Sequence, residues 1–174
     1  MSSEPDRFRR VYAETFEPLL AYSLRRVTQR EDAADVVAET FLTAWRRLDQ
    51  APDGPAVRAW LYGVAHRVLA NHLRGRRRHD RLDARLRAEE TGPGRASRPA
   101  AVIAEASTAI GSAFGRLAPA DRDLLMLVAV EGLSPGEIAR VFGCTATTVR
   151  VRLHRARARF ARELTVEGMP VKHL

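Results

Sequence analysis

The 174-residue sequence predicts an all-α protein made of two small helical domains. In both halves of the chain, apolar residues recur at steps of three and four, which is the spacing of one face of an α-helix. Between the halves, residues 91–100 contain four Gly or Pro residues and no apolar periodicity, as a flexible linker does. We therefore expect a first domain over residues 1–90 and a second over residues 101–174.

Three helices are expected in the first domain. An apolar stripe over residues 8–27 indicates the first, which Pro18 should break or restart. Thr and Glu at the two ends of residues 28–31 have the spacing of a capping box and predict the start of the second helix. A loop rich in Asp, Pro and Gly over residues 49–55 ends that helix, and apolar residues over 57–69 indicate a third. The buried face of the second helix is predicted at Ala34, Val37, Phe41, Ala44 and Leu48.

Start and stop signals divide the second domain into four expected helices. An apolar stripe indicates one over residues 103–117, and residues 119–132 open with Pro and close with Gly, which indicates another. The apolar run 124–130 is also compatible with a buried strand, but we favour a helix because no other segment offers a partner strand. Residues 134–137 combine an N-cap Ser, a Pro and a capping-box Glu, so a short helix is expected before Gly143.

A last, longer helix is expected after Gly143, with its buried face at Val149, Leu153, Ala156, Phe160 and Leu164. Together with the short helix before it, this helix has the spacing of a helix-turn-helix. Ala139 would allow the helices to cross closely, Gly143 can adopt the left-handed conformation of the turn, and Val149 would fill the wedge between them. An ordinary helical hairpin is the plain alternative. Residues 140–162 contain seven Arg and no acid, which favours DNA recognition in the major groove. The candidate contacts are Thr145, Thr147, Thr148, Arg150, Val151, Arg152, His154 and Arg155.

A second basic cluster lies along the third helix and past its apolar part. Aromatic and Arg side chains together suit an unpaired nucleic-acid strand, because bases stack on both. Alternatively, Trp60 belongs to the core and residues 76–78 form a solvated helix end. Codon bias would also account for many arginines, since all but one of the 29 basic residues are Arg. The candidates are Trp60, Arg67, Asn71, Arg74, Arg76, Arg77 and Arg78.

One face of the second helix is polar and mainly acidic, which is unusual in a chain of net charge +8. Such a face could dock a basic helical surface of a partner protein. The alternative is that these acids bind no partner and only stabilise the helix, because negative side chains near its start interact favourably with the helix dipole. The members of this face are Asp32, Asp35, Glu39 and Thr43.

Composition excludes several other classes of protein. The pI of about 11.0 points to a polyanionic partner. A single cysteine, Cys144, excludes an internal disulfide and a multi-cysteine zinc site. The first residues lack the apolar core of a signal peptide, and no apolar run approaches the roughly 18 residues of a membrane span. We expect a cytoplasmic protein without membrane insertion, metal, cofactor or catalytic residues.

Three segments resemble the extracytoplasmic-function, or group IV, sigma factors, which are promoter-recognition subunits of bacterial RNA polymerase. They are residues 31–48 (EDAADVVAETFLTAWRRL), 59–78 (AWLYGVAHRVLANHLRGRRR) and 133–160 (LSPGEIARVFGCTATTVRVRLHRARARF), in the order of that family. The resemblance extends over residues 8–164 and implies a sigma-2-like domain, a linker and a sigma-4-like helix-turn-helix domain.

The resemblance also implies roles for particular segments. It implies that Asp32, Asp35 and Glu39 dock on the clamp helices of the polymerase's largest subunit. Residues 60–78 would read and open the minus-ten promoter element, and residues 145–157 would enter the major groove of the minus-thirty-five element. An anti-sigma factor is the expected regulator. The chain departs from the common family pattern at Ala38, Arg67, Asn71 and Val151, so no base preference is assigned.

Two rival functions belong to other classes of protein. A stand-alone repressor or activator would protect a palindromic operator without polymerase, and its first domain would only dimerise. A nucleic-acid-processing enzyme would show metal-dependent turnover of DNA or RNA.

Overall fold

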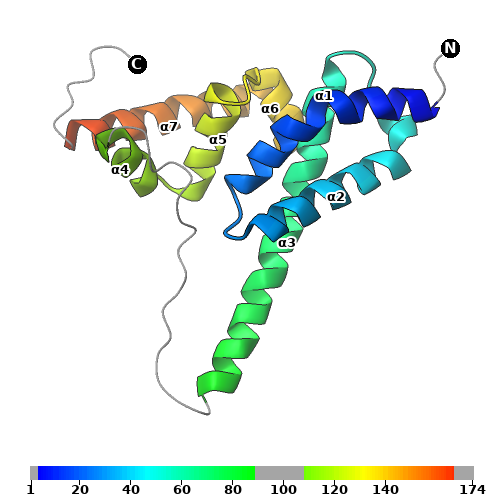
Figure 1. Ribbon diagram of the computed structural model, residues 1–174. Helices are drawn as coiled ribbons and strands as arrows, with labels where there is room; N and C mark the ends of the chain where they lie inside the picture. Colours follow the sequence, from blue (N-terminus) through cyan, green and yellow to red (C-terminus); the bar gives the residue numbers. More distant parts are fainter. Residues whose placement is uncertain (1–3, 89–107, 167–174) are drawn as a thin grey trace. The chain divides into compact units, whose positions relative to one another are not determined.

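The fold is all-α, as predicted, in a computed structural model that describes residues 4–88 and 108–166. These two ranges contain seven α-helices, one short 3-10 turn and no strand (Figure 1). The chain divides into two compact units, one holding residues 1–53 and 61–100 and the other holding residues 54–60 and 101–174. The expected linker lies outside the described residues, so the domain boundaries at 90 and 101 stay predictions.

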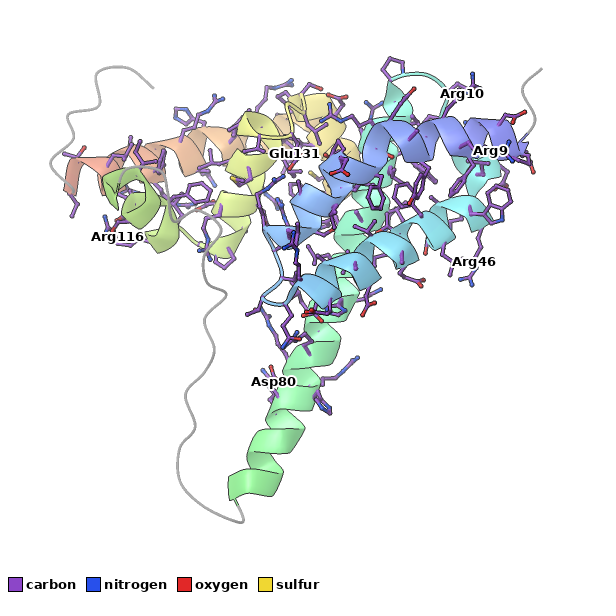
Figure 2. All side chains as sticks on the ribbon, in the orientation of Figure 1. Arg9, Arg10, Arg46, Asp80, Arg116 and Glu131 are labelled. Carbon is purple, nitrogen blue, oxygen red and sulfur yellow. The ribbon has the colours of Figure 1, made fainter. Side chains whose placement is uncertain are left out.

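Unit 1 is built from helices α1 (Glu4–Leu24), α2 (Arg30–Arg46) and most of α3 (Ala56–Ala88), with the 3-10 turn η1 (Leu48–Gln50) after α2. Helices α1 and α2 lie side by side, and α3 runs on beyond them to the part that carries Asp80 (Figures 1 and 2). Tyr22 of α1 meets Tyr62 of α3 edge to face at 5.2 Å, and both are 1% exposed. These buried rings fix α1 against α3.

Pro18 does not break the first helix, contrary to the prediction. Helix α1 continues through it to Leu24. A proline inside a helix costs about 3 kcal/mol, but the next turn carries Leu19 and Tyr22, each 1% exposed. Burying two such side chains contributes roughly 1.5–3 kcal/mol each, which offsets the loss.

The expected capping box over residues 28–31 is also wrong. Helix α2 begins at Arg30, and its N-cap, Gln29, makes no side-chain capping hydrogen bond. Instead, Arg76 of α3 donates to Oε1 of Gln29 at 3.4 Å and to the carboxylate of Asp32. The start of α2 is therefore set by contacts with α3 rather than by its own sequence.

The loop between α2 and α3 is held by Arg7 of α1. Its guanidinium donates to the carbonyl oxygens of Leu48 at 3.0 Å, Ala51 at 2.6 Å and Pro52 at 3.2 Å. It also lies 2.9 Å from the carboxylate of Asp53. One side chain thus satisfies three loop carbonyls that lie more than 40 residues away in the sequence.

Unit 2 contains α4 (Thr108–Arg116), α5 (Pro119–Ala129), α6 (Pro135–Phe142) and α7 (Ala146–Val166). The apolar run at residues 124–130 lies mostly in α5, which confirms a helix rather than a strand. Leu127, Ile138 and Val149, from three different helices, are each 0% exposed. Phe114 of α4 meets Phe160 of α7 edge to face at 5.9 Å, so α7 packs on α4 as well. The part of the predicted 103–117 stripe that precedes α4 lies outside the described residues.

Candidate nucleic-acid and protein interfaces

Helix α6 begins with the capping box that the sequence predicts. The backbone N–H and the hydroxyl of Ser134 donate to Oε2 of Glu137 at 2.8 and 2.6 Å, and the backbone N–H of Glu137 donates to Oγ of Ser134 at 3.3 Å. These hydrogen bonds from Ser134 lower the pKa of the Glu137 carboxyl, because they stabilise its charged form. The start of α6 is therefore fixed locally.

The turn between α6 and α7 has the predicted geometry of a helix-turn-helix. Gly143 adopts a left-handed conformation with φ of 65°, and the backbone N–H of Cys144 donates to the carbonyl of Ala139 at 3.0 Å. Val149 is fully buried between the helices and Ala139 is 7% exposed. The small and β-branched residues thus occupy the positions that the sequence assigns to them.

The eight predicted groove contacts lie at the start of α7 and on its first three turns. Thr145 caps the helix, because its hydroxyl accepts from the backbone N–H of Thr148 at 3.1 Å and lies 2.9 Å from the Thr148 hydroxyl. Arg150 donates to Oγ1 of Thr147 at 3.3 Å. The exposed members are Thr145, Thr147, Arg150, Val151, Arg152, His154 and Arg155, while Thr148 is half-buried.

Not every arginine of unit 2 is open to a ligand. Arg159 donates to the buried carboxylate of Asp121 at 2.7 Å, and Arg116 donates to Glu163 at 2.6 Å. Arg116 lies at the end of α4 (Figure 2). These pairs join α7 to α5 and α4. Within residues 4–88 and 108–166, by contrast, no ion pair was found for Arg150, Arg152 or Arg155.

Most of the predicted basic cluster on α3 is exposed. Arg74 donates to Oδ1 of Asn71 one turn earlier on the same face. Trp60 is half-buried, and Arg76 pairs with Asp32, so these two are partly engaged within the chain. The exposed members are Arg67, Asn71, Arg74, Arg77 and Arg78.

The acidic face of α2 separates into two parts. The side chain of Asp32 is only 13% exposed, and its carboxylate contacts Arg76 and lies 3.2 Å from Nε2 of His72. Asp35 and Glu39 are exposed, and Glu39 accepts from the Thr43 hydroxyl at 3.3 Å. Asp32 thus joins α2 to α3, whereas the carboxylates of Asp35 and Glu39 face outward.

A groove of about 970 Å³ brings two predicted sites together. Asp35, Glu39 and Thr43 line it from α2, and Arg67 and Asn71 line it from α3. The sequence assigned these residues to a protein-binding face and a DNA-binding face. Only the packing of α2 against α3 reveals that they share one surface.

A second groove, of about 530 Å³, lies between α1 and α2 and is apolar. Tyr12, Leu42 and Trp45 line it and are 42%, 46% and 45% exposed. The sequence placed Tyr12 in a buried stripe and did not single out this surface. A signal was present, because Leu42 and Trp45 fall outside the predicted buried positions of their helix.

Across residues 4–88 and 108–166, no three His, Cys, Asp or Glu side chains are grouped closely enough to hold a metal ion. Over the same ranges, every helix is too short or too polar to cross a lipid bilayer.

Comparison with protein families gives one match for each unit. Residues 12–79 match Sigma-70 region 2. Residues 107–160 match Sigma-70 region 4. The acidic face of α2 and the exposed arginines of α3 fall in the first match, and the helix-turn-helix falls in the second.

Similar proteins of known identity include two sigma factors. The chain is 33% identical over 150 residues to the RNA polymerase sigma factor CnrH of Cupriavidus metallidurans, covering 79% of this chain and 75% of that protein. It is 27% identical over 164 residues to the ECF RNA polymerase sigma factor BldN of Streptomyces coelicolor, covering 94% of this chain and 62% of BldN.

Solved structures agree in fold. The structure of CnrH in complex with the cytosolic domain of CnrY has a TM-score of 0.61 at 27% identity, covering 91% of this chain and 88% of that chain. The sigma factor RpoE of Bartonella quintana, in complex with the anti-sigma factor NepR, has a TM-score of 0.62 at 23% identity, covering 91% and 97% of the two chains.

Proposed function

The chain belongs to the extracytoplasmic-function group of the sigma-70 family, and from that premise we propose how its surfaces direct transcription initiation. Asp35 and Glu39 of α2 dock on core RNA polymerase, with Thr43 beside them and Asp32 holding α2 in place. The exposed face of α3 engages the minus-ten element, and α7 reads the minus-thirty-five element as duplex. The polymerase supplies the chemistry, in the cytoplasm where it works.

One observation carries this proposal. Exposed carboxylates on α2 lie in the segment that matches region 2, whereas exposed arginines on α7 lie in the segment that matches region 4. Carboxylates suit a basic protein surface and repel DNA, while arginines neutralise phosphates and bind guanine edges. The two surfaces therefore suit two different partners, a polymerase and a promoter.

Opening of the minus-ten element requires capture of unpaired bases. Unpairing costs a few kcal/mol per base, and stacking on aromatic or guanidinium groups contributes about 1–3 kcal/mol per base. Trp60 and the exposed arginines Arg67, Arg74 and Arg77 supply such groups on α3. Binding energy on α3 can thus drive melting, while duplex contacts of α7 fix the register.

Control by an anti-sigma factor is part of the proposal. Two of the similar structures show a sigma factor held by a partner: RpoE with the anti-sigma factor NepR, and CnrH with the cytosolic domain of CnrY. The apolar groove between α1 and α2 and the neighbouring carboxylates of Asp35 and Glu39 offer a helical partner both apolar and charged contacts.

The docking role is tested by charge reversal. The double variant Asp35→Arg with Glu39→Arg should lose affinity for purified core polymerase, since it places cations against a basic surface. Glu14→Arg with Glu17→Arg is the matched control, because both residues are exposed on α1 and the net-charge change is the same. Unchanged core affinity of the first variant would remove the docking assignment.

The function as a whole is tested by in vitro transcription. Core polymerase with the wild-type chain should initiate at defined sites on a promoter library, and core alone should not. A chain that does not join core, but protects a palindromic operator by itself, would instead be a stand-alone regulator.

A further inference from the structure

Val151 stands out on the proposed DNA-reading face of α7. It is 45% exposed, whereas Val149 and Leu153, two residues before and after it, are 0% and 5% exposed. Since each residue turns a helix by about 100°, Val151 points away from the buried side of α7. Its neighbours one turn away, Thr147 and Arg155, are exposed as well.

The fold gives no reason for a valine at this position. A β-branched residue is a poorer helix former than Ala, Arg or Lys, and an exposed one gains little from burial. Isolated exposed valines are common on protein surfaces. This one differs because Arg150 and Arg152 flank it in the sequence and Arg155 lies one turn later, so it sits in the middle of the strip that would approach DNA.

The chemistry of valine restricts which base edge it can face. Its two methyl groups neither donate nor accept a hydrogen bond, so placing it over the polar edge of guanine or adenine would desolvate that edge without compensation. Thymine alone among the four bases presents a methyl group, at C5, in the major groove. Contact with that methyl buries apolar surface on both partners.

We infer that Val151 is a specificity-determining residue that contacts the C5 methyl of one thymine in the upstream promoter element. The inference rests on the proposed function and adds to it a base and an atom. Arg150 and Arg152 supply the polar contacts around that thymine. Thr147 also has a methyl group. Its hydroxyl accepts from Arg150 at 3.3 Å, so its methyl is the other apolar group on this face that could contact the thymine methyl.

The test removes the methyl from the DNA. Holoenzyme of the full chain with core polymerase selects its preferred upstream sequence from a randomised duplex library. Each thymine of that sequence is then replaced in turn by deoxyuridine, which lacks only the C5 methyl. Wild type should bind one substituted duplex about fourfold more weakly, the factor that one buried methyl of about 0.8 kcal/mol gives.

Three variants decide which side chain reads the methyl. Val151→Ser should bind the thymine and deoxyuridine duplexes equally. Thr147→Ser, which keeps the hydroxyl and loses the methyl, should retain the discrimination. Val166→Ser should also retain it, because Val166 is 77% exposed at the far end of α7.

Several outcomes would overturn the inference. One is that wild type binds every deoxyuridine duplex as tightly as the thymine duplex. The others are that Val151→Ser still prefers the thymine duplex, or that only Thr147→Ser loses this preference. In these three cases a selected sequence still supports the proposed function. If the holoenzyme selects no sequence, the inference and the proposed reading of the minus-thirty-five element are overturned together.

Discussion

Replacing Asp32 by Ala should destabilise the packing of α2 on α3 and leave the docking face intact. The Asp32 carboxylate contacts Arg76 and lies 3.2 Å from Nε2 of His72, and its side chain is 13% exposed. Removal leaves the Arg76 guanidinium without this partner. Asp35→Ala is the matched control, because Asp35 lies one turn later on the same helix and is exposed.

The magnitude follows from the burial of the pair. A hydrogen bond to a charged group contributes about 1.5–3 kcal/mol. The Arg76 side chain is 36% exposed, so solvent screens part of this. We expect a loss of about 1–2 kcal/mol, which at a urea m-value of about 1.5 kcal/mol/M lowers the unfolding midpoint by roughly 1 M.

Tryptophan fluorescence is a suitable assay. The two tryptophans of the chain, Trp45 and Trp60, lie on α2 and α3, the helices that Asp32 joins. Arg76→Ala alone should lower the midpoint similarly, and the double variant with Asp32→Ala should lose less than the sum of the two.

The reasoning fails if Asp32→Ala unfolds at the wild-type midpoint and binds core polymerase as weakly as an Asp35 variant does. Asp32 would then belong to the docking face with Asp35 and Glu39, and its contact with Arg76 would contribute nothing measurable.

Three further predictions concern unit 2. Glu137→Gln should lower stability at neutral pH by about 0.3–1 kcal/mol, because Gln keeps the capping acceptor and removes only the negative charge near the start of α6. Ser134 lowers the pKa of Glu137 in the folded chain, so wild type should be more stable than this variant above the ordinary carboxyl pKa. The stability difference should vanish as the pH falls through the pKa that Glu137 has in the folded chain. A difference in thermal unfolding temperature that does not change with pH would contradict this. Arg150→Ala and Arg152→Ala should each weaken upstream-element binding by about 1–3 kcal/mol and relax the preference for the base pair that the side chain contacts, with core affinity unchanged in pull-down assays. Arg159→Ala should lower the thermal stability of unit 2, because Arg159 pairs with Asp121, and a binding defect with wild-type stability would reassign it to the DNA-reading face.

The helix-turn-helix could be predicted closely because its signals are local. The Ser134 cap, the left-handed Gly143 and the buried Val149 each depend on residues within a few positions. The buried face of the second predicted helix holds at four of its five positions, since Val37, Phe41, Ala44 and Leu48 are buried. The prediction is wrong at Ala34, which is exposed, whereas Ala33 and Val36 are buried instead. Helical periodicity indicates which residues face inward without reference to the partner helix.

What the sequence could not provide depends on contacts between distant segments. Pro18 breaks an isolated helix, but burial of Leu19 and Tyr22 overrides that preference. The sequence does not distinguish Asp32 from the other acids of α2, because its partner Arg76 lies on α3, 44 residues later in the sequence. The position of the predicted linker and the DNA and polymerase contacts stay predictions.

The hydrogen bonds from Arg7 to the α2–α3 loop make that loop a good attachment point for a spectroscopic probe. Surface loops usually broaden distance measurements because they move, whereas three carbonyls of this one are anchored to α1. Gln50 is exposed within it, and the only native thiol is Cys144. A nitroxide label on Gln50→Cys, in a chain that also carries Cys144→Ser, should therefore give a narrow distribution of distances to a second spin label on the polymerase in a reconstituted complex.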